Sequence, residues 1–358
     1  MNVGIVTMHR LHNYGSFLQA FALKKIIESY GHYVEFIDIV SPINAERKQG
    51  KYDVEKILRN CKRVVRYNYR LRDILKWRHD IRSVFNSSGR AWLGYNDNVN
   101  DNGEYDLIVI GSDEVFNCAD KVLGFRPGMF GHLLKTKRKI SYAASFGYTV
   151  YDDLCVNDLR ERVSKMLSEY EAISVRDKNS YDIVKRLVDV ESIISLDPVF
   201  VYNYDDYIEE VNYGDYILIY SYLERISSDE SAQIKKYASE NGIKIISLFS
   251  YYKWADYNLT ADPFKVLSLF KSAKCVVTDT FHGMVISIKY NKRFACYVRA
   301  SNYNKITYVL KYFDLERCVV GDKNSLKDIL DSVVSYDNVN DKINYETQKS
   351  ISYLGSFM

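Results

Sequence analysis

The sequence predicts an α/β protein with two domains, and three observations support this prediction. Short apolar runs that end in polar loops alternate with stretches of helical periodicity, which is typical of parallel sheets covered by helices. The chain has 358 residues, more than one ordinary domain needs. Hydrophobic residues make up 47% and charged residues 27%, a composition typical of a globular protein with a sizeable core.

The first half begins with a βαβ unit. Residues 3–6 form an apolar run, a polar loop follows at 9–15, and apolar residues then recur at helical spacing as far as Gly31. Residues 34–40 alternate between apolar and polar as a second strand does. Further strands are predicted at residues 106–110, 139–144 and 172–175. Polar loops follow these strands, and ligands bind at the carboxyl ends of parallel strands, so we expect a site there.

The second half repeats this alternation after a polar and acidic stretch that ends at Gly214. Its predicted strands are 216–222, 243–249, 275–278 and 293–297, and its predicted helices are 231–239, 263–273 and 284–289. We therefore expect an N-terminal α/β domain at 1–212, a C-terminal α/β domain at 213–335 and a C-terminal tail or helix at 336–358. Two Rossmann-like domains in tandem resemble a GT-B-like arrangement with an interdomain cleft.

Charge and targeting signals exclude several classes of protein. The formal net charge is only +3, so the chain lacks the positive field of a nucleic-acid-binding protein. The first residues lack the apolar segment of a signal peptide, and no run of about 18 apolar residues suggests a membrane span. The six cysteines contain no C-x-x-C pair, so we expect reduced thiols and no bound metal. A cytoplasmic protein is expected.

Residues 54–82 form a basic segment with ten Lys or Arg residues and three acidic ones. One interpretation is a solvated helical pair that covers the sheet. The other is peripheral contact with a membrane at its inner face, through attraction to anionic lipid headgroups or to a lipid-linked diphosphate. The sequence does not decide between them.

The strongest candidate site is Thr278–Gly283, where an acid, a hydroxyl, an imidazole and a glycine meet at the predicted start of a helix. Helix N-termini bind anions through free N–H groups, and glycine allows close approach to the backbone. His282 is suited to contact a phosphate and to transfer a proton near neutral pH. The alternative is a histidine that only caps the helix.

Three further positions combine chemistry with a place at a strand end. Arg176 follows a predicted buried strand, and its planar fork suits a phosphate or carboxylate; the alternative is a structural ion pair with Asp177 or Asp113. Asn13–Gly15 closes the first βα turn, where a sugar or phosphate would lie, unless it is an ordinary turn. Asp113 is placed either to orient a hydroxyl or to cap the next helix.

Common catalytic motifs do not occur in this sequence. There is no G-x-x-x-x-G-K-[ST], G-x-G-x-x-G, H-E-x-x-H or G-x-S-x-G. This argues against P-loop ATPase, dinucleotide-binding, zinc-protease and α/β-hydrolase functions. Transfer chemistry on an anionic donor is the class that remains favoured.

Six sequence blocks together resemble the polysaccharide pyruvyl transferase family. The blocks are Asn13–Ala20, Gly111–Asn117, Tyr142–Gly147, Ser174–Asp177, Asp197–Pro198 and Thr278–Gly283. The resemblance implies a GT-B-like fold and transfer of a carboxyvinyl unit from phosphoenolpyruvate to a sugar of a surface-polysaccharide precursor, free or lipid-linked. The product would be a pyruvate ketal, and phosphoenolpyruvate would be a co-substrate, with no other cofactor.

The resemblance also implies roles for individual residues. Arg176 would hold the donor phosphate or carboxylate, and His282 would be the general acid. The donor pocket would be lined by Arg176, Thr280, Phe281, His282 and Gly283. On the acceptor side we expect Asn13, Tyr14, Gly15, Asp113 and Ser145.

The chain departs from the family pattern at three positions. Thr280 stands where some members have an arginine, Glu114 where glutamine is common and Phe116 where tryptophan is common. Two other functions stay open, one because the same two-domain plan serves other transferases and one because of the Thr280 departure. One is a GT-B-type glycosyltransferase that uses a nucleotide sugar, and the other is a non-catalytic glycan-binding or assembly protein.

Overall fold

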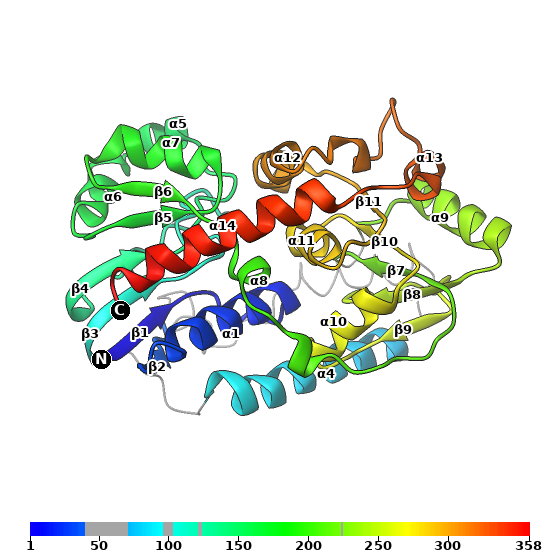
Figure 1. The fold of residues 1–358 in the computed structure, drawn as a ribbon, viewed down its shortest axis with the longest axis horizontal. Helices are drawn as coiled ribbons and strands as arrows, with labels where there is room; N and C mark the ends of the chain where they lie inside the picture. Colours follow the sequence, from blue (N-terminus) through cyan, green and yellow to red (C-terminus); the bar gives the residue numbers. More distant parts are fainter. Residues whose placement is uncertain (40–70, 96–102, 121–123, 223–224) are drawn as a thin grey trace.

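The computed structural model describes residues 1–39, 71–95, 103–120, 124–222 and 225–358, and it contains two large parallel sheets (Figure 1). The first sheet has the strand order β2-β1-β3-β4. Its strands are β1 (Asn2–Val6), β2 (Tyr33–Phe36), β3 (Glu104–Ile110) and β4 (Lys135–Ser141). Val3 of the central strand β1 pairs with Val34 on one side and with Leu107 on the other.

A short pair of strands continues the first sheet. β5 (Ile173–Val175) pairs in parallel with β6 (Ser192–Ile194). Parallel bridges from Ile140 to Ala172 and from Ala144 to Val175 join this pair to the end of β4. As a result, Arg176 follows β5 at the same edge of the sheet where β3 and β4 end.

The second sheet has the order β11-β10-β7-β8-β9 and is also fully parallel. Its strands are β7 (Tyr216–Tyr220), β8 (Lys244–Leu248), β9 (Tyr257–Leu259), β10 (Cys275–Thr278) and β11 (Phe294–Cys296). Every residue of β7 and β10 is buried, as expected for strands covered on both faces. The predicted class, two Rossmann-like α/β units in a GT-B-like arrangement, is confirmed.

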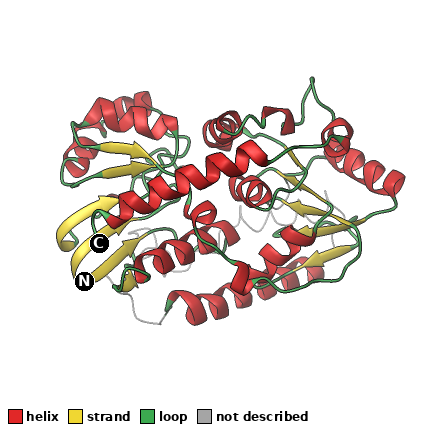
Figure 2. Cartoon of the chain, in the orientation of Figure 1, coloured by secondary structure: helices red, strands yellow, loops and turns green. Residues whose placement is uncertain are grey.

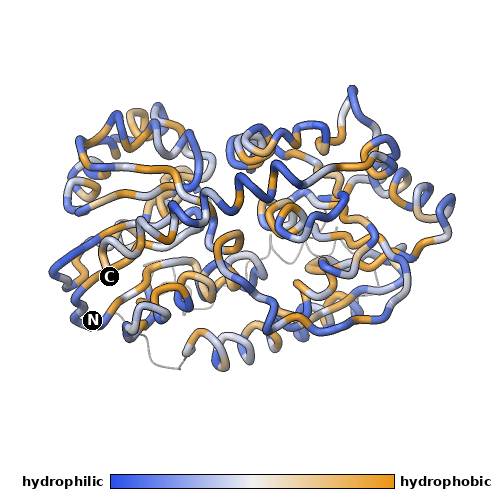
Figure 3. The backbone as a smooth tube through the Cα atoms, viewed as in Figure 1, coloured by the Kyte–Doolittle hydropathy of each residue, from blue (hydrophilic) through white to orange (hydrophobic). Residues whose placement is uncertain are grey.

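Helices flank both sheets (Figure 2). They are α1 (Tyr14–Glu28), α4 (Leu71–Ser88), α5 (Tyr151–Val156), α6 (Arg160–Leu167), α7 (Lys178–Leu187), α8 (Pro198–Val201), α9 (Ser228–Asn241), α10 (Pro263–Ser272), α11 (Phe281–Lys289), α12 (Tyr303–Tyr312), α13 (Leu326–Asp331) and α14 (Asp337–Gly355). Within the described ranges, no helix is both long and apolar enough to cross a membrane. Hydrophobic stretches run along the strands of both sheets, whereas α14 is largely hydrophilic (Figure 3).

The two halves share one hydrophobic core through α1. The centre of the Phe21 ring on α1 lies 4.9 Å from the centre of the Phe264 ring on α10, and the centre of the Phe17 ring lies 6.1 Å from it. The buried hydroxyl of Tyr14 donates to the carbonyl of Ala261 at 2.9 Å. This continuous cluster holds residues of both sheets' helices, so the halves are joined by packed apolar side chains.

Helix α14 crosses both halves (Figure 1). The hydroxyl of Tyr353 donates to the carbonyl of Ser141 at the end of β4, at 2.9 Å. Just before the helix begins, the hydroxyl of Tyr336 donates to the carbonyl of Lys292 in the second half, at 2.5 Å. Helix α4 likewise reaches across, because Ser88 donates to the carboxylate of Asp262. The domain limits at residues 212 and 335 stay a prediction.

Helix caps account for the main differences between the observed and the predicted starts of the helices. The helix predicted at 284–289 begins at Phe281, because the Thr280 hydroxyl accepts from the backbone N–H of Gly283. The helix predicted at 231–239 begins at Ser228, because Ser227 and Glu230 form a capping box. Strand limits shift by a few residues, and the strand predicted at 34–40 ends at Phe36. Residues 54–70 of the basic segment lie outside the described residues, and residues 71–82 form the first part of α4.

Replacing a buried side chain of α14 by alanine is expected to destabilise the whole protein. Leu354 is fully buried, whereas Tyr345 on the same helix is 68% exposed. Leu354→Ala should lower the free energy of unfolding by about 2–5 kcal/mol, because it leaves a cavity under the helix. Urea unfolding of Leu354→Ala and of the control Tyr345→Ala measures this. An equal effect of the two variants would show that α14 is not packed on the core.

Candidate functional site between the two sheets

A cavity of about 250 Å³ lies where the strand ends of the two sheets meet. We call it the polar cavity, and its lining includes Asn13, Ser16, Asp113, Tyr222, His282 and Lys305. The first three follow β1 and β3 of the first sheet, and the others come from the second half. The carboxyl ends of parallel strands thus supply its polar groups, as in other open α/β sheets.

The loop after β10 places His282 on the first turn of α11. The Thr278 hydroxyl donates to the carbonyl of Tyr220 at 2.7 Å and accepts from the backbone N–H of Thr280 at 3.1 Å. A Cβ atom on Gly283 would lie 2.1 Å from the Thr278 hydroxyl oxygen, so only glycine fits this approach. Thr280 therefore acts here as a helix cap, and His282 is the residue of this loop that faces the polar cavity together with Phe281.

Arg176 and His282 converge on one carboxylate oxygen. Nη1 of Arg176 donates to Oδ2 of Asp197 at 2.6 Å, and Nε2 of His282 lies 3.5 Å from the same atom. Arg176 is 3% exposed and Asp197 is 1% exposed. Asp197 is a site residue that the sequence prediction omitted, although Asp197–Pro198 was one of the matching blocks. Its other oxygen caps α8 by accepting from the backbone N–H of Val199 at 3.0 Å.

The opposite charges of this cluster stabilise the ionised forms of Asp197 and Arg176. Burial by itself would raise the pKa of Asp197, but the neighbouring His282 and Arg176 side chains hold it well below its ordinary value. Burial would lower the pKa of Arg176, but the carboxylates of Asp197 and Asp113 raise it overall. Asp197 is therefore a carboxylate and Arg176 a guanidinium, and both side chains are buried.

Asp113 brings a second buried carboxylate to the polar cavity. Its Oδ2 accepts from the Ser16 hydroxyl at 2.5 Å, and its Oδ1 accepts from the backbone N–H of Glu114 at 2.9 Å. Burial opposes ionisation, yet the charges of Arg176 and His282 lower the pKa of Asp113. Its φ angle of 90° lies in the left-handed region, an uncommon conformation for a residue other than glycine. Strain of this kind is often found at functional sites.

The turn Asn13–Gly15 contacts both halves. Asn13 caps α1 and donates through Nδ2 to the hydroxyl of Tyr222 at 2.8 Å. Burial raises the pKa of Tyr222 to about 12, so this hydroxyl stays protonated. A Cβ atom on Gly15 would lie 2.1 Å from Cγ and Nδ1 of His282, so the bare backbone of Gly15 packs directly against the imidazole. Tyr14 points instead into the shared core.

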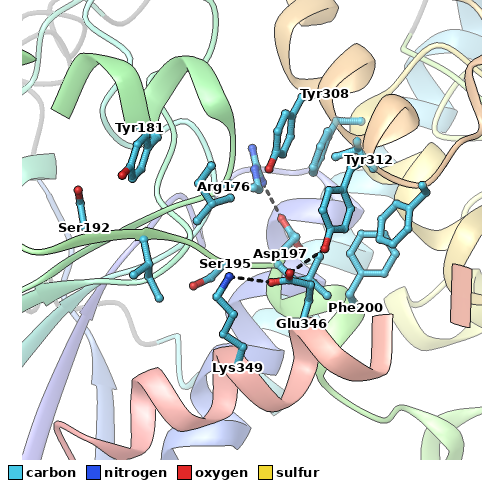
Figure 4. Close-up of a pocket in the computed structure, with 16 residues that line it drawn as sticks. Arg176, Tyr181, Ser192, Ser195, Asp197, Phe200, Tyr308, Tyr312, Glu346 and Lys349 are labelled. Carbon is cyan, nitrogen blue, oxygen red and sulfur yellow. Dashed lines mark hydrogen bonds and ion pairs between the residues drawn. The ribbon is translucent and has the colours of Figure 1, made fainter. Parts of the chain in front are cut away.

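The remaining predicted residues take different places. Ser145 is buried away from the polar cavity, and its hydroxyl donates to Asp177 at 2.6 Å. The polar cavity brings together Asn13, Asp113, Phe281 and His282 from the predicted set. The polar cavity is not lined by Tyr14, Gly15, Thr280, Gly283 or Ser145. Arg176 lines a neighbouring cavity, which it shares with Phe281 (Figure 4).

Sequence reasoning missed two cations that the second half contributes to the polar cavity. Lys305 of α12 forms an ion pair with Glu114 across the polar cavity. Arg225 also lines this cavity, and its Nη1 lies 3.8 Å from Oδ2 of buried Asp279. Burial raises the pKa of Asp279. No local pattern distinguishes Lys305 or Arg225 from surface cations. Across the described ranges, no group of three His, Cys, Asp or Glu side chains is placed to hold a metal ion.

Two parallel sheets that meet at a buried cation–carboxylate cluster define an α/β protein with its candidate site between two halves. The family model of the polysaccharide pyruvyl transferases matches residues 13–301. The chain belongs to this family and is therefore a transferase. No curated protein matches the chain.

Solved structures show weak likeness to the chain. An S. aureus MnaA–UDP structure has a TM-score of 0.48 at 9% identity and covers 98% of this chain and 91% of that one. The E. coli heptosyltransferase WaaC with ADP has a TM-score of 0.41 at 10% identity, covering 97% and 100%. A functionally uncharacterised protein from Klebsiella pneumoniae has a TM-score of 0.38 at 16% identity, covering 66% and 87%. None of these values supports an assignment of activity.

Gly15→Ala is expected to displace His282. Alanine favours a helix over glycine by up to about 1 kcal/mol, so any loss of stability would come from the contact with the imidazole. We expect the free energy of unfolding to fall by about 1–3 kcal/mol and the NMR signals of the His282 ring to shift. The matched control is Gly321→Ala, where a Cβ meets no atom within 4 Å. Unchanged His282 signals in Gly15→Ala would contradict the packing.

Asp197→Asn should destabilise the protein in a pH-dependent way. The variant leaves Arg176 buried without its counter-charge, which should cost about 3–5 kcal/mol at pH 7. Because the pKa of Asp197 is lowered in the folded protein, its stabilising effect is present above the ordinary value of 3.8 and is lost as the pH falls below it.

The native protein should therefore lose more stability than Asp197→Asn when the pH falls from 7 to 3, as measured by urea unfolding. Asp341→Asn, at an exposed position on α14, serves as the control. Parallel pH profiles of the native protein and Asp197→Asn would refute the assignment of a buried ionised carboxylate.

Proposed function

We propose that this transferase moves a carboxyvinyl unit from phosphoenolpyruvate to a sugar of a surface-polysaccharide precursor and closes it into a pyruvate ketal. One observation carries the proposal. A guanidinium from the first half and an imidazole from the second half approach the same negatively charged oxygen, that of Asp197, at 2.6 and 3.5 Å. A site that stabilises one buried carboxylate in this way is suited to a small donor that carries a carboxylate and a phosphate.

In this proposal His282 is the general acid. Its ring lines the polar cavity, is held on one side by the backbone of Gly15, and has the carboxylate of Asp197 beside Nε2. Asp197 supplies a counter-charge for the protonated ring and orients it. His282 would deliver its proton to the methylene carbon of the donor, which becomes a methyl group and leaves a cationic centre at the neighbouring carbon.

The acceptor would lie in the polar cavity. The ionised carboxylate of Asp113 and the amide of Asn13 offer hydrogen-bond partners for sugar hydroxyls there. One hydroxyl would attack the cationic carbon and release a proton, phosphate would then leave with the electrons of its C–O bond, and a second hydroxyl would close the ketal and release a second proton. One of the two protons returns to His282, and the other is taken up by the phosphate that leaves.

The absence of an arginine at position 280 does not remove positive charge from the polar cavity. Lys305 and Arg225 both line it, and both come from the second half as residue 280 does. Lys305 also lies 5.7 Å from the centre of the Phe281 ring, next to His282. These two cations support binding of an anionic donor in a chain that carries Thr280.

The purified protein should release phosphate when phosphoenolpyruvate is supplied together with galactose-, glucose- or N-acetylmannosamine-containing acceptors. His282→Ala and Arg176→Ala should each lower the rate by roughly 100-fold or more, because proton delivery or charge stabilisation is lost. His79→Ala and Arg160→Ala are matched controls, because these side chains are 83% and 55% exposed. Turnover of a nucleotide sugar, with none of phosphoenolpyruvate, would refute the proposal.

A further inference from the structure

Helix α4 is packed against the shared core by one face only. It lies along the lower edge of the molecule in Figure 1. Its inner face is apolar, with Ile74, Ile81 and Phe85 buried. The centre of the Phe85 ring lies 4.8 Å from the centre of the Tyr14 ring. These contacts fix the rotation of the helix about its axis, so the opposite face is held outward in one orientation. None of the roles assigned so far uses that outward face.

The outward face of α4 carries basic side chains at helical spacing. Arg72, Lys76, His79 and Arg82 are all exposed. They follow one another in steps of three or four residues, so they lie on the same face of the helix. In the described part of the chain, no carboxylate forms an ion pair with Arg72, Lys76 or Arg82. Three of these positive charges are therefore available to a partner outside the chain.

The two acidic residues of α4 lie on another side of the helix. Oδ2 of Asp73 accepts from the hydroxyl of Tyr251 at 3.3 Å, so Asp73 faces the second half. Asp80 follows two helical turns later and lies on the same side as Asp73. Its Oδ1 contacts Nδ1 of His79 at 3.4 Å. The positive charge of the outward face is therefore concentrated there, although the formal net charge of the whole chain is only +3.

An apolar side chain lies among these cations. Leu75 is 53% exposed, and it is a neighbour of both Arg72 and His79 on the helix surface. Basic and apolar side chains on one helix face act together at a bilayer surface, because the cations attract anionic headgroups while the apolar group enters the headgroup region. A soluble polyanion has no such region for Leu75. The combination therefore favours an anionic lipid surface as the partner.

We propose that the outward face of α4 docks reversibly on a membrane surface that contains anionic lipid. Of the two interpretations of the basic segment, this is the second, now assigned to particular side chains of α4. Docking would hold the polar cavity near the membrane, because the ring of His12 stacks on Phe85 with 5.6 Å between the centres and the adjacent Leu11 lines that cavity. The inference does not depend on the transfer reaction.

Sedimentation of the full chain with lipid vesicles tests the docking. The native protein should bind vesicles of phosphatidylglycerol and phosphatidylcholine in equal parts, and should not bind vesicles of phosphatidylcholine alone. Removal of three cations should weaken binding by roughly 100-fold, because each basic residue near an anionic surface contributes to the attraction. That variant combines Arg72→Gln, Lys76→Gln and Arg82→Gln. Leu75→Ser should weaken binding by roughly fivefold, since it keeps the charge but removes the apolar group.

The matched control removes the same number of charges from exposed positions on α9 and α13, and it should bind as the native protein does. It combines Lys235→Gln, Lys236→Gln and Lys327→Gln. A charge-preserving variant of α4, Arg72→Lys with Arg82→Lys, should also retain binding. Substitutions at exposed positions usually change stability little, and thermal melting followed by circular dichroism checks that each variant is folded.

Four results would overturn the inference. The first is equal binding of the native protein to both kinds of vesicle. The second is unchanged binding by the α4 triple variant, and the third is equal weakening by the α4 and control triple variants. The fourth is binding of heparin, a soluble polyanion, without binding of anionic vesicles, which would assign the outward face to a soluble acidic partner instead.

Discussion

The ion pair between Arg176 and Asp197 lies almost entirely out of water, and the site is arranged around it. Removing two charges from solvent is expensive, and only a close contact with further hydrogen bonds repays that cost. Arg176 follows β5, Asp197 caps the start of α8, and His282 comes from the other half. These three elements must therefore be correctly placed relative to one another before the whole cluster can form. The pair therefore fixes the relative position of the strand ends and leaves little freedom for the cavities on either side.

Two kinds of contact hold the halves together, and they differ in how they would respond to separation. Behind the site, Phe21 and Phe264 belong to one continuous apolar core. Across the site, the contacts are polar or bare backbone: Asn13 with Tyr222, Glu114 with Lys305 and Gly15 with His282. Water can replace the polar contacts at a modest cost in free energy, whereas exposing the apolar core to water is strongly unfavourable. The halves are thus joined by apolar packing on one side of the site and by polar or backbone contacts across it.

The sequence was sufficient for the class of fold and for the convergence of Arg176 and His282, whose roles in the reaction stay a prediction. Buried parallel strands such as β7 and β10 appear as continuous apolar runs, and the loops after them are recognisable by their polar residues. Asp197 was missed as a site residue because an aspartate before a proline is also a common start of a helix, which is one of its two roles here. The partners of Asp113 and Glu114 could not be predicted, since Ser16 and Lys305 are brought to them only by tertiary structure.

Helix α14 determines when, during synthesis, the first half can complete its folding. The first sheet is synthesised early, but the carbonyl of Ser141 and the side chain of Arg138 on β4 find their partners in Tyr353 and Phe357. The backbone N–H of Leu196 likewise depends on Ser350. The amino-terminal half can complete its surface only once residues 336–358 have emerged from the ribosome, so during translation it exposes the face that α14 later covers.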